Sequence, residues 1–183
     1  RSSDLCFVGK VRLPEFLQQQ LAPKKGDIIQ IPNTWQGYQD KESSKLFECY
    51  EDELKYYAEK YHYSPTDGKV IGQHDGAHLF TTGQRKGLHV GGTVEPLFVI
   101  DTDTEKNIIY VGEGHAHPGL FRRTLFVKKE DIHWIRTDLA LSLHQTMETM
   151  VRIRYRQPLQ KATLYLNDSG LYIDFTTPQS AIT

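Results

Sequence analysis

The sequence predicts a mainly β fold with a few helices. From about residue 69 onward, short runs rich in Val, Ile, Tyr and Phe alternate with turns rich in Gly, Asp and Asn. Before that point, two stretches place apolar residues at helical spacing. Because many short strands at this spacing are typical of a small barrel or sandwich, we expect the second part of the chain to form one.

Each element follows from its own pattern. Leu13–Leu21 carries a helical apolar face, and Pro14 suits its first turn. A longer helix is predicted from about Lys45 to Tyr63, ending before Pro65. The predicted strands span residues 27–31, 69–73, 77–82, 96–102, 107–112, 121–127, 150–156, 161–166 and 171–175, and residues 101–107 and 167–170 read as hairpin turns.

The composition of the 183 residues is that of a globular protein, with 38% hydrophobic and 25% charged residues and a net charge of −1. The chain has no long apolar run and no signal peptide, and its two cysteines form no pattern. We therefore expect a cytoplasmic protein without a disulfide framework. Because the chain begins with Arg1 and not with Met, we also expect a fragment of a longer protein.

The charges are unevenly distributed. Residues 39–67 contain eight acidic residues and four lysines, whereas residues 120–161 contain nine Lys or Arg and four acidic residues. On the predicted strand 150–156, Arg152, Arg154 and Arg156 share one face and form a ladder of phosphate donors. The alternative is a solvated strand face whose arginines pair with acidic residues. The basic half is the expected face for a polyanion.

A second basic feature is the loop from Gly83 to Gly87, which contains Arg85 and Lys86. Its glycines would let it approach a nucleic-acid backbone closely, although an ordinary turn has the same composition. The loop is not a P-loop, because the Gly-Lys-Ser/Thr ending is absent.

Cysteine and histidine supply the remaining candidates. Cys6, between Leu5 and Phe7, and Cys49, within the predicted helix, both fit ordinary packed thiols when taken alone. The pairs His74/His78 and His115/His117 are spaced as zinc ligands can be, but no thiol or carboxylate cluster completes a tetrahedral set. We expect no metal.

Several segments together resemble the tRNA-specific 2-thiouridylases (MnmA/TrmU type). The resemblance covers nearly the whole chain, in order, and is specific through the combination of its motifs. These are Ser3–Gly9, the Phe16-Leu17 helix with Pro23 and Gly26, Gly68–Gly76, Thr82–Leu88, Tyr110–Pro118, Ile153–Gln157 and Pro178–Thr183.

The resemblance implies a chemistry and its residues. In that family, ATP adenylates the C2 oxygen of the wobble uridine (U34) of tRNAs for Lys, Glu and Gln, and a cysteine persulfide supplies sulfur to C2. Cys6 matches the persulfide carrier, and Arg154 and Tyr155 match tRNA contacts. A second cysteine, in an N-terminal domain that this chain lacks, would attack Cys6 in a disulfide-forming step. ATP would bind in that absent domain, and a further protein would donate the sulfur.

The domains that the resemblance implies are a β-rich central adaptor domain at 1–120 and a small C-terminal β-barrel at 121–183, expected to be truncated, that binds tRNA. Residues 33–66 are longer than the usual connection in the family. We expect them to form one amphipathic helical insertion that packs on the central domain and does not bind RNA, because residues 39–67 carry a net charge of −4. The fragment alone should be inactive.

Two other functions fit parts of the pattern. A non-enzymatic β-barrel RNA-binding module would use the same arginines and leave Cys6 as an unreactive core thiol. A zinc-binding domain would use the histidine pairs. Reactivity of native Cys6 toward a thiol probe distinguishes the RNA-binding module, whose Cys6 would not react, from the enzyme. Elemental analysis for zinc tests the zinc-binding domain.

Overall fold

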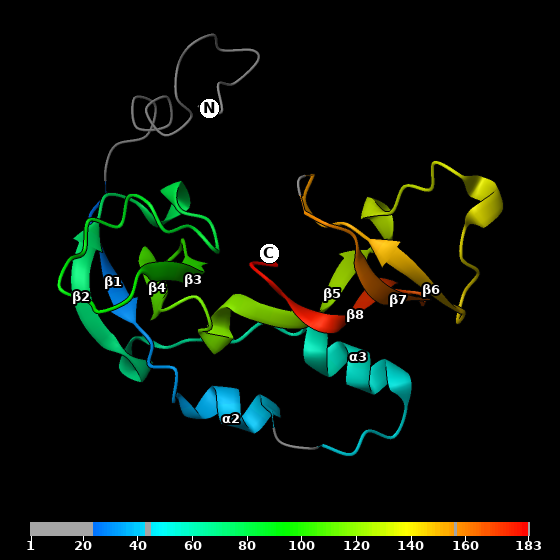
Figure 1. The fold of residues 1–183 in the computed structure, drawn as a ribbon, viewed down its shortest axis with the longest axis horizontal. Helices are drawn as coiled ribbons and strands as arrows, with labels where there is room; N and C mark the ends of the chain where they lie inside the picture. The colour runs from blue at the N-terminus through cyan, green and yellow to red at the C-terminus, as the bar shows by residue number, and fades with distance from the viewer. Residues whose placement is uncertain (1–23, 43–44, 156, 183) are drawn as a thin grey trace, which may run out of the picture. The chain divides into compact units, whose positions relative to one another are not determined.

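The structure is a computed structural model that describes residues 24–42, 45–155 and 157–182 (Figure 1). The chain divides into two compact units. Unit 1 is the described part of Arg1–Asn33 together with Tyr63–His117, and unit 2 is the described part of Thr34–His62 together with Pro118–Thr183. Each unit contains one four-stranded sheet, and the described residues contain two α-helices. The prediction of a mainly β fold with few helices is confirmed.

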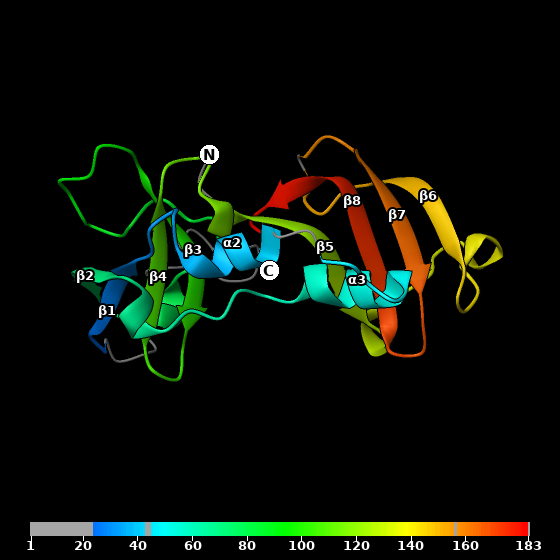
Figure 2. The ribbon, with the colours of Figure 1, turned by 90° about the horizontal axis from the view of Figure 1, so that it is seen from below.

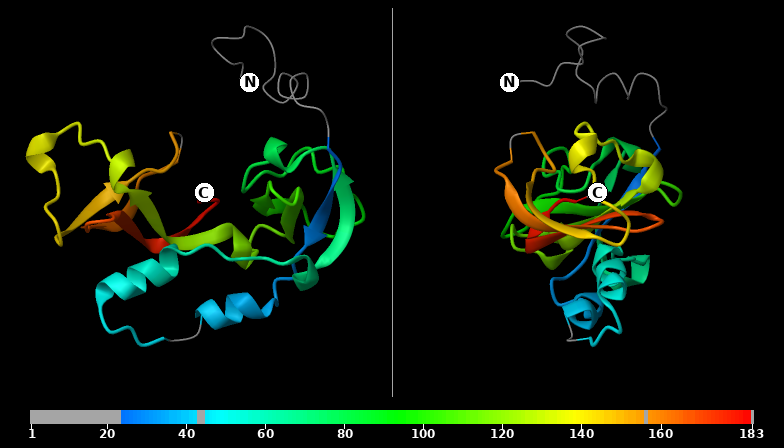
Figure 3. Two further views of the ribbon diagram at one scale, coloured as in Figure 1. Left: turned by 180° about the vertical axis from the view of Figure 1, so that it is seen from behind. Right: turned by 90° about the vertical axis from the view of Figure 1, so that its right-hand side faces the viewer.

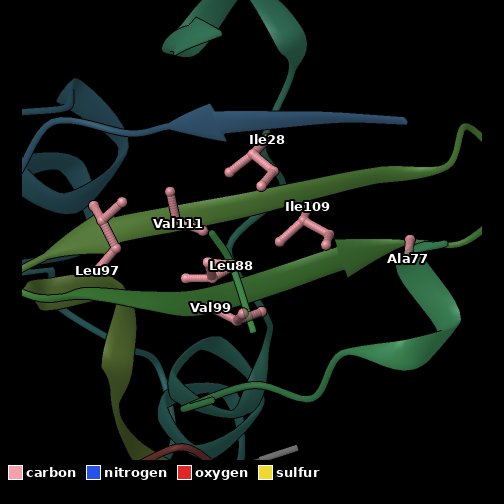
Figure 4. Packing of buried hydrophobic residues seen from close by; sticks show 7 residues of the cluster. All are labelled: Ile28, Ala77, Leu88, Leu97, Val99, Ile109 and Val111. Atoms are coloured by element: carbon pink, nitrogen blue, oxygen red, sulfur yellow. The ribbon is translucent and has the colours of Figure 1, made fainter. Parts of the chain in front are cut away.

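The sheet of unit 1 mixes parallel and antiparallel pairing. Its strands are β1 (Gly26–Gln30), β2 (Lys69–His74), β3 (Leu97–Asp103) and β4 (Ile108–Glu113), in the order β2-β1-β4-β3. β1 runs parallel to β4, and the β1–β2 and β3–β4 pairs are antiparallel. Apolar side chains from three of these strands meet those of the connecting segments on one face of the sheet (Figure 4), where the buried residues are Ile28, Ala77, Leu88, Leu97, Val99, Ile109 and Val111.

The strand predicted at 77–82 is wrong. Ala77–Leu79 forms a short 3-10 turn. The backbone N–H of Ala77 donates to Asn107 Oδ1 at 2.9 Å, and the N–H of Leu79 donates back to the Gly76 carbonyl at 3.1 Å. Gly76 has φ = 151°, at the edge of the region that favours glycine. Local capping by Asn107 and the glycine therefore overrides the apolar pattern.

Two histidines of unit 1, His74 and His117, are buried, which favours their neutral form. His74 Nδ1 accepts the Gly76 N–H at 2.9 Å, and His117 Nε2 lies 3.0 Å from the Ile31 carbonyl oxygen. A Cβ added at Gly112 would lie 2.4 Å from the His117 ring, so the ring is tightly packed against β4. Burial lowers the pKa of both histidines from the ordinary value of 6.5.

Unit 1 should therefore lose stability on mild acidification. These histidines bind protons more readily in the unfolded state than in the folded state. The free energy of unfolding of unit 1 is therefore at its full value above pH 6.5, the ordinary histidine pKa, and falls as the pH drops below it. We expect lower hydrogen-exchange protection of β1 and β4 at about pH 5.5 than at about pH 7.5, after correction for intrinsic exchange. The exposed His62, replaced by Gln, is the control and should leave this dependence unchanged. Equal protection at the two pH values would contradict a neutral, buried state.

Unit 2 is built on an antiparallel sheet. Its strands are β5 (Phe121–Lys128), β6 (Thr146–Val151), β7 (Gln160–Leu166) and β8 (Gly170–Ser180), in the order β5-β8-β7-β6 (Figure 2). One face of the sheet carries a hydrophobic core that includes Ala162, Leu164, Leu171, Ile173, Phe175 and Ile182. The predicted turn at 167–170 is present, because Asn167 Oδ1 accepts the N–H groups of Ser169 and Gly170 at 3.0 Å.

The helices of unit 2 differ from the single helix predicted. The structure has α2 (Gln36–Glu42) and α3 (Tyr50–Ala58), so the prediction of one helix from Lys45 to Tyr63 is wrong at both ends. The short 3-10 helices within the described residues are Pro65–Asp67, Ala77–Leu79, Pro118–Leu120, Lys129–Asp131 and Thr137–Leu139. Pro65–Asp67 lies in unit 1, and Ser64 and Asp67 form a capping box at its N-terminus.

The predicted packing of the insertion on the central domain is also wrong. Helix α3 packs on β5 and β8 of unit 2 (Figure 3). Its buried Leu54 is accompanied by polar contacts: Glu51 accepts from Tyr165 and Asn167 at 3.0 Å each. Two of the three acidic residues in the first turn of α3, Glu51 and Glu53, therefore bind side chains of unit 2, whereas Asp52 contacts Cys49 and Lys55 near its own helix.

Candidate nucleic-acid interface

The arginine segment lies in a turn, not on a strand. Strand β6 ends at Val151 and β7 begins at Gln160, so the predicted strand 150–156 and its ladder of side chains on one face are wrong. The Gln157 N–H donates to the Arg154 carbonyl at 3.0 Å, which closes the turn. Arg152 and Arg154 are exposed within it. Arg156 lies outside the described residues.

This β6–β7 turn (residues 152–159) is held by the end of β8. Arg154 Nη2 donates to the Ala181 carbonyl at 2.7 Å. Gln157 Nε2 donates to Gln179 Oε1 at 2.7 Å. Arg152 Nη1 donates to the Tyr155 carbonyl at 3.3 Å inside the turn. A guanidinium has five N–H donors, so both arginines keep donors for an external acceptor such as a phosphate oxygen.

Tyr155 is 90% exposed. On a regular strand, alternation would have turned it toward the core, whereas the family resemblance makes it a contact residue. Because the strand ends before Tyr155, alternation does not apply. The Tyr155 side chain is exposed, as a contact residue must be. An exposed aromatic ring beside arginines is suited to stacking on a nucleobase.

The basic loop of unit 1 is anchored to the edge of β3. Gly83 N–H donates to the Val99 carbonyl at 2.7 Å, and the Val99 N–H donates to the Gln84 carbonyl at 2.9 Å. Gly83 and Gly87 have φ of 84° and 89°, which side-chain-bearing residues rarely adopt. Arg85 and Lys86 between them are exposed. The loop thus presents two cations from a fixed base.

Two of the nine basic residues counted in 120–161 serve the fold instead. Arg123 donates to Asp174 at 2.9 and 2.8 Å and to Glu53 at 2.8 Å, and its guanidinium lies 4.8 Å from the Tyr57 ring centre. Arg122 donates to the Ala58 carbonyl at 3.3 Å and also to the Ile182 carbonyl. Sequence reasoning missed this cluster, because its acidic partners lie 51 and 70 positions away from Arg123.

The structure describes only one of the two cysteines. Cys6 lies outside the described residues. Cys49 is exposed at the N-cap of α3, and its thiol donates to Asp52 Oδ2 at 3.2 Å, so the interpretation of Cys49 as a packed thiol is wrong. The cause is that α3 begins only at Tyr50, which leaves Cys49 outside the apolar face.

The structure describes no cluster for a metal. Within residues 24–42, 45–155 and 157–182, no three His, Cys, Asp or Glu side chains form a group that could hold a metal ion. His74 and His117, one from each predicted pair, face backbone partners. The absence of a bound metal stays a prediction. None of the described helices is long and apolar enough to cross a membrane.

Comparison with known proteins matches both units to family models. Residues 57–113 match the tRNA methyl transferase PRC-barrel domain, and residues 123–183 match the aminomethyltransferase beta-barrel domain. Both are barrel-type domains, which agrees with the predicted β-rich adaptor and barrel.

Curated relatives match along the entire chain. The tRNA-specific 2-thiouridylase MnmA of Flavobacterium johnsoniae is 56% identical over 182 residues, and that of Christiangramia forsetii is 50% identical over 182 residues. The MnmA of Karelsulcia muelleri is 44% identical over 181 residues. The chain covers 99–100% of its own length in these alignments and 44–46% of the relatives, so it spans about half their length. The chain therefore belongs to the family of tRNA-specific 2-thiouridylases, of which it contains the central and C-terminal domains.

Proposed function

We propose that the full-length protein is a tRNA-uridine 2-sulfurtransferase that thiolates C2 of the wobble uridine of tRNA by ATP-dependent adenylation and persulfide sulfur transfer. Relatives up to 56% identical along this chain are named tRNA-specific 2-thiouridylases, which supports tRNA thiolation. The observation within the chain that carries the proposal is the exposed arginine–tyrosine turn between β6 and β7. We propose tRNAs for Lys, Glu and Gln as substrates, a separate protein as sulfur donor and the cytoplasm as location.

In this proposal the chain supplies tRNA binding and the sulfur carrier. Arg152, Arg154 and Arg156 contact phosphates, and Tyr155 stacks on a base. The loop containing Arg85 and Lys86 contributes phosphate contacts from unit 1. Cys6 carries the persulfide, whose outer sulfur is a strong nucleophile and leaves by cleavage of one S–S bond.

The described residues do not fit an ATP site. The glycine-bounded basic loop Gly83–Gly87 lacks the Gly-Lys-Ser/Thr ending, and Leu88, which follows it, is buried in an irregular segment and does not open a helix. We assign no part of the ATP step to these residues. We propose that ATP binds to a part of the full-length protein outside this chain and that the chain alone is inactive.

Replacing Arg154 by Ala in the full-length protein should weaken tRNA binding and flatten its salt dependence. With one phosphate contact fewer, tRNA releases about one counterion fewer when it binds. The slope of log binding constant against log salt concentration should therefore become shallower by about one unit. Filter binding across a salt series measures both quantities. Arg136, which is exposed and pairs with Asp138 at 2.5 Å, gives the matched control Arg136→Ala. An unchanged affinity and slope in Arg154→Ala would remove the β6–β7 turn from the interface.

A further inference from the structure

One of the bonds that hold the β6–β7 turn goes to a buried glutamine on β8. Gln179, on β8, is 7% exposed. Its Nε2 donates to the Thr177 carbonyl at 2.6 Å, which leaves its Oε1 to accept from Gln157 Nε2 at 2.7 Å. The backbone of β8 pairs with β5 at the same point, where Gln179 lies opposite Arg122. Gln179 therefore joins a rigid strand to a turn.

The bond to Gln179 acts on the side chains that face outward. Gln157 closes the turn through its backbone bond to Arg154, and Arg154 rests on the Ala181 carbonyl two residues beyond Gln179. Fixing Gln157 therefore fixes the backbone that carries Arg154 and the 90% exposed Tyr155. Side chains that are ordered before binding lose less conformational entropy when a ligand arrives, so their contacts yield more affinity.

We propose that Gln179 is a positioning residue for tRNA binding, which acts through its hydrogen bond to Gln157 to hold Arg154 and Tyr155 in the orientation that meets the nucleic acid. The inference rests on the proposed function, because it assumes that this turn contacts tRNA. Gln179 itself is too buried to touch the ligand. Its loss should therefore weaken binding without removing a phosphate contact.

The test compares Gln179→Met with Arg154→Ala in the full-length protein, by filter binding of tRNA across a salt series. Methionine fills the space of glutamine and cannot form either hydrogen bond. We expect Gln179→Met to lower tRNA affinity about fivefold, the effect of about one newly mobile side chain. The salt slope should stay at the wild-type value, whereas Arg154→Ala should reduce it by about one unit. The exposed Gln145, replaced by Met, is the matched control and should change neither quantity.

Gln157→Met tests the same bond from its other end and serves if Gln179→Met is unstable. Each single variant should weaken binding to a similar extent, and the double variant should bind no worse than either, because both remove the same bond between Gln157 and Gln179. If Arg154→Ala weakens binding but both glutamine variants bind as wild type, or if the two glutamine effects add, the positioning role is wrong and the tRNA interface stands. If Arg154→Ala is itself without effect, the proposed interface fails and this inference fails with it.

Discussion

Replacing Cys6 by Ser in the full-length protein is expected to abolish 2-thiouridine formation while tRNA affinity stays near the wild-type value. A serine hydroxyl cannot form a persulfide, so no sulfur can be carried to the uridine, whereas the Arg154 turn that we propose for tRNA binding is unchanged. The measurement is mass spectrometry of nucleosides from tRNA after reaction, with filter binding for affinity.

Cys49→Ser provides the matched control for this loss. Cys49 is exposed, as a reactive thiol would be, but its partner is the Asp52 carboxylate, and it does not match the persulfide position. Cys49→Ser should therefore retain both thiolation and tRNA affinity. Thiolation that persists in Cys6→Ser would overturn the assignment of Cys6.

The second large effect is expected when Asp174, which lies under helix α3, is replaced, and it concerns the stability of unit 2. The Asp174 carboxylate accepts two hydrogen bonds from Arg123 at 2.9 and 2.8 Å and one from Thr124 at 2.9 Å, and its side chain is 10% exposed. Tyr50 of α3 donates to it at 3.4 Å. Burial and the Asp174 carboxylate raise the pKa of Tyr50 to about 12, so this phenol remains a donor at neutral pH.

Asp174→Asn should lower the free energy of unfolding of unit 2 by about 2–3 kcal/mol, because Arg123 then faces an amide in place of its main buried counter-charge. The estimate lies below the range for a fully buried pair, since Arg123 is 35% exposed and keeps Glu53. For a domain of this size the melting temperature should fall by on the order of 10 °C. Trp35 and Trp134 are the two tryptophans of the chain and both lie in unit 2, so their fluorescence reports this unit alone.

Asp138→Asn is the matched control for this charge removal. Asp138 also pairs with an arginine, Arg136, but their side chains are 61% and 69% exposed. Exposed ion pairs contribute little, so no measurable change is expected. Equal effects of Asp174→Asn and Asp138→Asn on the unfolding curve would show that the contact of α3 with the sheet does not depend on the buried charges.

The strands were predictable because their signal is local. The strands predicted at 27–31, 69–73 and 161–166 lie within one residue of the observed β1, β2 and β7 at each end. Alternating apolar residues and the turn residues that bound them carry this information within a few positions. The Asn167–Gly170 turn was predictable for the same reason, since Asn binds its own backbone two and three residues on.

The predictions that are wrong concern segments whose structure depends on residues far away in the sequence. The arginine strand was predicted from alternation alone, but Arg154 and Gln157 bond to residues 27 and 22 positions away, and these contacts accompany a turn. The place of α3 depends on Arg123 and Asp174, which lie far along the chain from Glu53. Sequence charge counts treat such residues as solvent-facing, and only the fold shows that their charges meet each other.

The most direct test of the proposed sulfur transfer follows the sulfur atom itself. Full-length protein is incubated with a persulfide donor, digested without reductant and analysed by mass spectrometry of its cysteine peptides. We expect one additional sulfur atom on the peptide that contains Cys6, lost when tRNA and ATP are added, and none on the peptide that contains Cys49. Thiolated tRNA formed while Cys6 never carries the extra sulfur would contradict it.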